Sequence, residues 1–366
     1  MIATDSLSPQ HYFSEQTYLQ EQINIFKRHW FFVGFTDQLS QPHDFITTEI
    51  CGLPVVVQNF DGELSALLNI CSHRKARLQT ATSGNRPLRC PYHCWSFRKD
   101  GQLAGVPQQR TEFDFSEADK TKLALKKFQL ANCGSFLFVR IATEGPTLAE
   151  FLGPYAAILQ QLSGYFSDPV HQGRYDWQTN WKLAVETVLE VYHVAGVHPE
   201  SFSKLARAEC EVLSNPPHNI GNTPLQETPQ KWWQRVRKQL KLVQHPDLIE
   251  YNHFFIYPNL AIGLTNGSLM SVQTYEPVTT TKTVLNFRLR MISTADGPAA
   301  DGSFKRAVLQ NFIDFNHQTL EEDRIVAESC QQNMPYTEQA GILGRCEDRI
   351  RLFHQAWQQD MEQTNV

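Results

Sequence analysis

The feature that most constrains this chain is a pair of short segments in which cysteine and histidine alternate. The first reads Cys71-Ser72-His73, and the second, seventeen residues further on, reads Cys90-Pro91-Tyr92-His93. Two thiolates and two imidazoles on short segments indicate a soft metal centre. A Rieske [2Fe–2S] cluster takes two cysteines on one iron and two histidines on the other, so each segment would supply one ligand to each iron. A structural zinc site is the alternative, but its like ligands usually stand together in sequence, so the mixed pairs favour the cluster.

Length and composition exclude several classes of protein. The 366 residues suggest about two domains, and the net charge of −5 argues against a general nucleic-acid binder. The chain has no run of eighteen apolar residues, and its first residues lack the basic and apolar regions of a signal peptide, so we expect no membrane span and no leader. Eight cysteines in a chain this long are not a disulfide scaffold. We therefore expect reduced thiols and a cytoplasmic protein.

The residue pattern changes twice along the chain. Residues 11–35 look helical and then extended, and residues 40–145 carry short strand-like runs separated by turns. This pattern predicts a small all-β domain whose loops present both metal-binding segments. From residue 146 on, we expect helices over 147–164, 181–197, 303–333 and 347–364, an extended piece at 170–178, and an antiparallel meander over 251–292. A meander with long helices packed on it is α+β architecture.

A second group of metal-ligand types follows residue 181. Glu190 and His193 are three residues apart, which would put them on one face of the predicted helix. Pro199 disfavours helix at His198 and Gly196 weakens the turn before it, so the chain can bring His198 back toward His193. Two imidazoles and one carboxylate form the ligand set of non-haem Fe(II) oxygenases. Taken alone, a histidine pair at a helix end is more often a surface feature, and the metal interpretation gains its strength from the first motif.

Together these motifs resemble the catalytic α subunit of Rieske-type non-haem iron oxygenases, over nearly the whole chain. The resemblance rests on Cys71-Ser-His73, Cys90-Pro-Tyr-His93-Cys-Trp, Asn180-Trp181-Lys182, Glu190-Val-Tyr192-His193, His198-Pro199 and Glu321-Glu322-Asp323. It implies an N-terminal helical segment over 1–39 that packs on the catalytic domain, a Rieske [2Fe–2S] domain over 40–145, and a helix-grip catalytic domain over 146–366. The cluster ligands would be Cys71, His73, Cys90 and His93.

The resemblance also implies roles in the second group. The mononuclear iron would be held by His193, His198 and Asp323, although sequence spacing alone leaves Asp314, Glu321 and Glu322 equally open for the third ligand. Glu190 would bridge His193 to His93 of a neighbouring subunit in a homotrimer, so that electrons cross a subunit interface. Glutamate, where the family usually has aspartate, resembles the branch that oxidises quaternary ammonium compounds such as carnitine and betaines.

The implied activity is a monooxygenase that hydroxylates or oxidatively dealkylates a small molecule with O2. Electrons would come from NAD(P)H through a separate flavin/iron–sulfur reductase, possibly with a ferredoxin, because the chain shows no glycine-rich dinucleotide motif. An aromatic-ring hydroxylating dioxygenase is an alternative within the family. Outside the enzymes, the alternatives are a Rieske electron carrier and a zinc-stabilised binding protein, but a carrier would need only about one hundred residues.

Three residues beside the cluster ligands depart from the family pattern. Ser72 replaces a common proline, and Lys75 and Cys94 stand where glycine is usual. A side chain at position 94 would strain its loop unless φ there is negative. Ser72 and Cys94 would also alter hydrogen bonding around the cluster and hence its potential.

Two further segments have open interpretations. A cation-binding pocket would use aromatic faces, for which Phe254, Phe255, Tyr257 and Tyr275 are candidates, although aromatic residues in a meander more often form core. The basic run over 231–241 would dock an acidic redox partner or, more commonly, form a solvated helix face.

Overall fold

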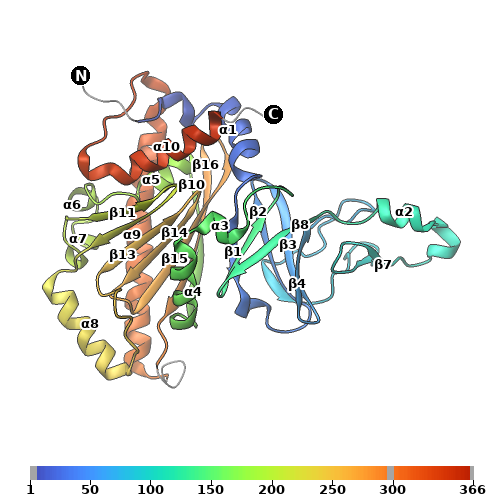
Figure 1. The fold of residues 1–366 in the computed structure, drawn as a ribbon, viewed down its shortest axis with the longest axis horizontal. Coiled ribbons are helices and arrows are strands. Elements are labelled where there is room, and N and C mark those ends of the chain that lie inside the picture. Colours follow the sequence, from blue (N-terminus) through green and yellow to red (C-terminus); the bar gives the residue numbers. More distant parts are fainter. Residues whose placement is uncertain (1–5, 295–300, 363–366) are drawn as a thin grey trace. The chain divides into compact units, whose positions relative to one another are not determined.

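The computed structural model describes residues 6–294 and 301–362 (Figure 1). Its backbone divides into two compact units. One is continuous from Phe26 to Gln160, and the other joins the residues up to Ile25 to those from Gln161 onward. The smaller unit thus includes residues 26–39 and 146–160, which the predicted boundaries at 39 and 145 place outside the Rieske domain.

The smaller unit is built on an antiparallel sheet of seven strands (Figure 1). Its core strands are apolar on both faces: Val55, Val56 and Val57 are fully buried. The strand order is β1 (Phe31–Phe35), β9 (Phe136–Arg140), β8 (Lys127–Cys133), β4 (Glu63–Leu68), β3 (Leu53–Phe60), β2 (Asp44–Ile50) and β5 (Ser83–Asn85), with β6 (Ser96–Phe97) and β7 (Leu103–Gly105) as a separate hairpin. The predicted all-β architecture around the metal-binding segments is confirmed. Two short helical segments, a π-helical turn (Gln109–Phe113) and α2 (Glu117–Lys122), lie between β7 and β8.

The helix expected over 147–164 is in fact two helices, α3 (Leu148–Leu152) and α4 (Tyr155–Tyr165). Thr147 caps α3 by accepting a hydrogen bond from the amide of Glu150. Gly153 ends it with φ +52°, a left-handed conformation that glycine adopts readily, and Pro154 follows without an amide hydrogen. The Gly-Pro pair therefore divides the predicted helix.

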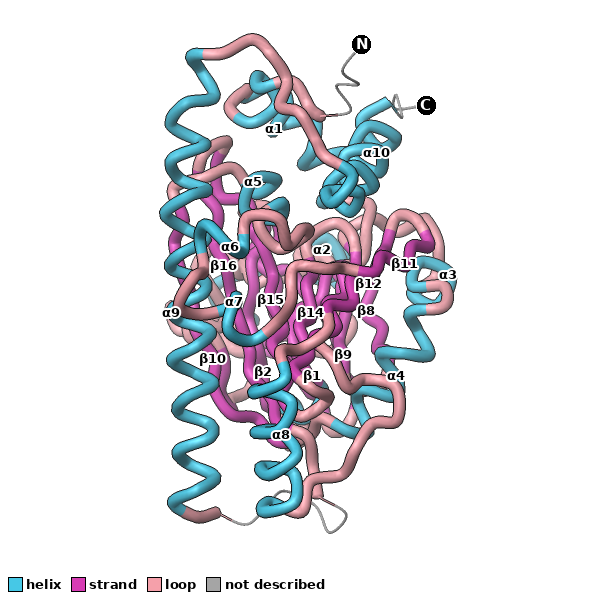
Figure 2. The backbone as a smooth tube through the Cα atoms, turned by 90° about the vertical axis from the view of Figure 1, so that its left-hand side faces the viewer, coloured by secondary structure: helices cyan, strands magenta, loops and turns pink. Residues whose placement is uncertain are grey.

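The larger unit contains a second antiparallel sheet of seven strands, which confirms the predicted meander and α+β class. Their order is β10 (Asp168–Trp177), β16 (Lys282–Met291), β15 (Leu269–Thr279), β14 (Leu260–Thr265), β13 (Tyr251–Ile256), β12 (His218–Thr223) and β11 (Glu211–Asn215). Helix α9 (Ser303–Asn333) runs beside this sheet, and α8 (Glu227–Leu240) and α10 (Asp348–Glu362) lie nearer its two ends (Figure 2). The predicted end of the last helix at residue 364 lies outside the described residues.

Helix α9 buries one narrow stripe along its whole length. The stripe recurs every three or four residues, which is the period of one helix face. Its members are Lys305, Val308, Phe312, Asn316, Leu320, Asp323, Ala327 and Gln331. Asp323 is therefore the acidic residue that α9 turns inward, whereas Glu321 remains nearly half exposed and pairs with Arg324.

A buried carboxylate ties the first residues of the chain to the larger unit. Glu21 ends α1 (Glu15–Glu21) and, like Lys182, is completely buried, with 2.6 Å between Lys182 Nζ and Glu21 Oε1. The indole nitrogens of Trp181 and Trp357 also donate to this carboxylate, at 2.9 and 2.7 Å. Removal of one partner alone would be strongly destabilising, because it leaves an uncompensated buried charge.

Among the helices of the described residues, none combines the length and the apolar character that crossing a bilayer requires.

Candidate iron sites

Both cysteine–histidine segments lie on loops of the smaller unit and fold in the same way. Cys71 follows β4, and Cys90 follows β5. In each loop the amide four residues later, of Lys75 or of Cys94, donates to the cysteine carbonyl at 3.0 Å. Each cysteine amide in turn donates to the carbonyl five residues further on, at 2.8 Å. The two loops are thus equivalent turns that present their ligands from a fixed backbone.

The same turns place Lys75 and Cys94 in the left-handed region, at φ +63° and +60°. A side chain other than that of glycine costs of the order of 1 kcal/mol in this region. Lys75 and Cys94 both carry this cost. The sequence departures at these positions are therefore strained and are held by the surrounding fold.

The four side chains fit a metal cluster. The thiols of Cys71 and Cys90 are buried and close enough to hydrogen-bond; burial, and then this bond, raise the pKa of Cys71. The rings of His73 and His93 lie with their centroids 4.7 Å apart. Among the described residues, the Nδ1 atom of each ring is buried without a hydrogen-bond partner. Buried polar atoms normally find a partner, so these two nitrogens are suited to bind a group such as the two-iron cluster.

Aromatic side chains fix the orientation of both imidazoles. Trp95 stacks on His73 at 4.6 Å with the planes nearly parallel, and Tyr92 lies over His93 at 3.8 Å. Tyr92 is also 56% exposed. One face of His93 is thus covered by a side chain that itself reaches the surface.

In the larger unit, the helix predicted over 181–197 ends much earlier. Helix α5 (Trp181–Glu186) is followed by turns up to α6 (Val194–Val197). The Glu190 carboxylate explains part of this break, because it accepts hydrogen bonds from the amides of Tyr192 and His193. Such side-chain-to-backbone bonds compete with helical ones. The prediction of a shared helix face for Glu190 and His193 was wrong, although the two residues do meet.

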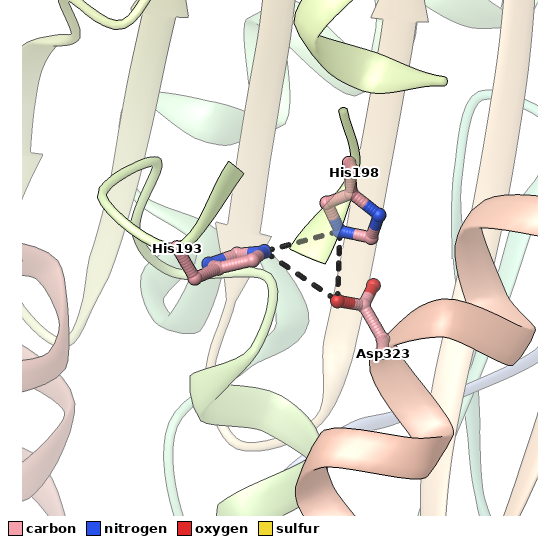
Figure 3. Close-up of side chains that lie close together, drawn as sticks. All are labelled: His193, His198 and Asp323. Atoms are coloured by element: carbon pink, nitrogen blue, oxygen red, sulfur yellow. Dashed lines mark hydrogen bonds and ion pairs between the residues drawn. The ribbon is translucent and has the colours of Figure 1, made fainter. Parts of the chain in front are cut away.

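The structure brings His193, His198 and Asp323 together (Figure 3). The Nε2 atoms of the two histidines are 3.2 Å apart. The Asp323 Oδ1 atom lies 3.0 Å from His198 Nε2 and 3.4 Å from His193 Nε2. Three donor atoms that converge from one side match the two-histidine, one-carboxylate arrangement that leaves positions open on the metal.

A second carboxylate holds each imidazole from behind. Glu190 contacts Nδ1 of His193, and Glu322 accepts from Nδ1 of His198 at 2.7 Å. Ser201 Oγ also donates to Glu322, at 2.5 Å. With Nδ1 bonded to a carboxylate, each ring can direct its Nε2 atom at a metal. Sequence reasoning missed this role for Glu322, since no local pattern separates it from a solvated helix acid.

The charges within this group support one another. Burial acts to lower the pKa of His193, but Asp323 and Glu190 outweigh it and raise that pKa to about 10. Burial acts to raise the pKa of Asp323, but its bonds to the two histidines lower it. A metal ion bound here would displace protons from the imidazoles.

The group opens into a pocket between α9 and the sheet. Its aromatic walls are Phe202, Tyr251, Phe312 and Phe315. The four aromatic residues considered from the sequence (Phe254, Phe255, Tyr257 and Tyr275) are at most 2% exposed and belong to the core. For them the core interpretation is confirmed, and the pocket uses other aromatic residues.

Two family models match the chain. The Rieske [2Fe-2S] domain matches residues 29–129, and the catalytic domain of the ring hydroxylating alpha subunit matches residues 168–363. The first match confirms the cluster over the zinc alternative. The second covers more than half of the chain and leaves the cluster-only electron carrier without support.

Curated relatives align over part of their length. The glycine betaine monooxygenase oxygenase subunit of Chromohalobacter salexigens is 34% identical over 207 residues, which is 55% of this chain and 45% of that protein. The carnitine monooxygenase oxygenase subunit of Acinetobacter baumannii is 30% identical over 192 residues, or 51% of each chain. The chain thus spans about half the length of the curated relatives it matches.

Solved structures agree in fold over almost the whole chain. A quaternary ammonium Rieske monooxygenase in complex with L-carnitine superposes with a TM-score of 0.79 at 20% identity, covering 98% of this chain and 96% of that one. Naphthalene 1,2-dioxygenase from Rhodococcus sp. gives a TM-score of 0.76 at 18% identity, with 98% and 95% covered. This agreement shows a shared fold. Because the catalytic-domain model alone covers more than half of the chain, the chain belongs to the ring-hydroxylating alpha-subunit family of Rieske non-haem iron oxygenases.

Proposed function

We propose that this protein is the oxygenase component of a multicomponent Rieske system. It would use O2 and electrons from NAD(P)H to hydroxylate or oxidatively dealkylate a small molecule. One observation carries the proposal: His193, His198 and Asp323 converge in a pocket, and the same chain also contains the cysteine–histidine loops. A chain with only the cysteine–histidine set could store or pass an electron, and a chain with only the converging set could bind oxygen. Neither could couple electron transfer to oxygen binding.

The two donor sets would divide the chemistry. Cys71, His73, Cys90 and His93 would hold the [2Fe–2S] cluster, and the three converging ligands would hold the mononuclear Fe(II). When bound, the cluster supplies single electrons and the mononuclear iron activates dioxygen. The protein's own part is to keep the imidazoles oriented through Glu190 and Glu322 and to surround the substrate with an apolar pocket that excludes water.

Glu190 is proposed to link His193 of one subunit to His93 of the next in a homotrimer. Its carboxylate already contacts Nδ1 of His193, which supports a connecting role. Two exposed aromatic residues adjoin the two histidines in sequence: Tyr92 is 56% and Tyr192 is 74% exposed. Large exposed aromatic side chains are typical of surfaces that a partner subunit covers.

A separate reductase completes the proposed system. It would be a flavin/iron–sulfur protein that oxidises NAD(P)H, possibly with a ferredoxin. We place the system in the cytoplasm, because the six cysteines other than Cys71 and Cys90 are free thiols. The basic helix α8 buries Trp233 and Val236 and exposes Lys231, Arg235 and Lys238, in agreement with a solvated helix face. Arg237 is the exception, because it is half-buried and donates to Asn266 and Ser268.

For the substrate we propose a quaternary ammonium compound. The two relatives described above are named for glycine betaine and carnitine, and the aromatic pocket walls suit a cation. Oxidation of an aromatic acid is the second candidate, since the anthranilate 1,2-dioxygenase large subunit of Acinetobacter baylyi is 33% identical over 184 residues.

The test is a turnover screen with the purified protein, a Rieske-system reductase and NADH. Consumption of O2 and NADH is measured with quaternary amines and with aromatic acids, and the products are identified by mass spectrometry. We expect coupled consumption and an oxygenated or demethylated product with one compound class. Iron analysis should give about three irons per chain, and a value near two with no turnover would contradict a second iron site.

A further inference from the structure

The floor of the pocket is a row of small and polar residues across four strands. Pairing between β12, β13, β14 and β15 aligns Gly221, His253, Gly263 and Ser271 side by side. All four line the pocket. Glycine within a strand often marks a place where another group approaches closely. At Gly221 that group is a guanidinium, since a Cβ atom there would come within 2.6 Å of Nη1 of Arg349.

Arg349 reaches this floor from α10 and is itself a pocket-lining residue, although only 3% exposed. Its Nε atom donates to Oδ1 of Asn219 at 2.6 Å. Its Nη2 atom donates to the His253 ring at 2.8 Å and to the His253 carbonyl at 3.1 Å. These acceptors engage one edge of the planar guanidinium, while Nη1 lies over Gly221.

His253 serves here as a neutral acceptor. Burial and then the charge of Arg349 lower the pKa of His253 well below its usual value. Its Nδ1 atom therefore accepts from Arg349, and the ring proton lies on Nε2. The three acceptors hold the cation in place without adding a negative charge of their own.

We infer that Arg349 forms a carboxylate-binding subsite, so that the substrate of this pocket carries a carboxylate. This inference rests on the proposed function and narrows its substrate. A planar guanidinium fixed in an apolar pocket can bind a carboxylate through charge-assisted bonds, which are among the strongest in proteins.

The subsite would also set the direction in which the substrate lies. Tyr251 lines the pocket within electrostatic reach of both Arg349 and Asp323. A substrate beside Tyr251 can therefore place its carboxylate at Arg349 and its remaining atoms toward the three converging ligands. Such an arrangement would favour an amino acid betaine or an aromatic acid over the corresponding alcohol.

Binding is measured by titration calorimetry with the oxidised holoenzyme and no reductant, so that turnover does not interfere. The probes are two pairs of acid and alcohol: glycine betaine with choline, and benzoate with benzyl alcohol. We expect at least one acid to bind wild type about tenfold or more tightly than its alcohol. In Arg349→Gln this preference should fall to within about twofold, and Arg349→Lys should keep part of it.

Arg351→Gln is the matched control. Arg351 lies two residues further along α10 and pairs with Asp348, so the preference should remain. The inference is overturned if wild type prefers neither acid, or if Arg349→Gln retains the preference. Thermal melting and cluster absorbance show whether Arg349→Gln is folded. If it is not, the acid-over-alcohol preferences of wild type and of Arg349→Lys still test the inference. Turnover is scored separately, so failure of the oxygenase proposal would appear as absent O2 consumption and leave these binding ratios unaffected.

Discussion

The two donor sets of this protein are built in opposite ways. The cysteine–histidine loops supply four candidate ligands within 23 residues, and each loop is shaped by its own backbone hydrogen bonds. The converging group takes His193 and His198 from a broken helix, and its third member, Asp323, comes from α9, 125 residues after His198. The first set is a local structure, whereas the second exists only when the larger unit is folded. A substitution that disrupts one donor set should therefore leave the other donor set intact.

The strongest test of this separation is Asp323→Ala. It removes the carboxylate on which both histidines converge, so we expect loss of one iron per chain and loss of all turnover. The visible absorption of the cluster should stay as in wild type. The measurements are iron content, absorbance and O2 consumption.

Glu321→Ala is the control for this variant, because Glu321 lies two residues away on the outer side of α9 and pairs with Arg324. It should keep both metals. Loss of cluster absorbance in Asp323→Ala would show that the two sets depend on one another.

The next test asks whether the two sets communicate through Glu190. Glu190→Gln keeps the shape of the side chain and removes its charge. With iron supplied in excess, to offset the weaker orientation of His193, both metals should bind while turnover falls by about a hundredfold or more. Stopped-flow absorbance should show a reduced cluster that reoxidises slowly in the presence of substrate and O2. Activity near that of wild type would rule out the proposed route between subunits.

A smaller effect is expected behind His198. Glu322→Gln weakens the bond that orients this imidazole, and loss of such a partner typically costs 10- to 100-fold in metal affinity. Competition with a chelator should show this loss at the mononuclear site, with the cluster unchanged. Gln318→Ala, which removes only the amide that donates to Glu322 Oε1, is the matched control and should have a weaker effect.

The smallest effect concerns the loops alone. Cys94→Gly and Lys75→Gly relieve a left-handed side chain but make the unfolded chain more flexible, so the net stabilisation is about 0.5 kcal/mol for each. The change in stability is measured by denaturation, with the loss of cluster absorbance as the signal. Arg74→Gly, at an ordinary backbone position of the same loop, should instead destabilise.

The same contrast explains how far the sequence could be interpreted. The loop ligands were recognisable because their chemistry is contained in two short segments. Asp323 had to be taken from a family resemblance, although the buried stripe from Val308 to Gln331 shows that the period of α9 selects it. The end of α5 was missed because a side chain, Glu190, caps the backbone amides after it. The roles of Glu322 and Arg349 depend on contacts between distant segments, which no local pattern reports.

The buried carboxylate of Glu21 has a consequence for the order in which the chain can fold. Its partners Lys182 and Trp357 lie far along the chain, so this arrangement is completed only when nearly all of the sequence has been synthesised. In the sequence, the smaller unit lies between the two parts that Glu21 joins. Its last residue is synthesised some two hundred positions before Trp357. During translation, the smaller unit can therefore fold before α10, and with it the larger unit, is complete.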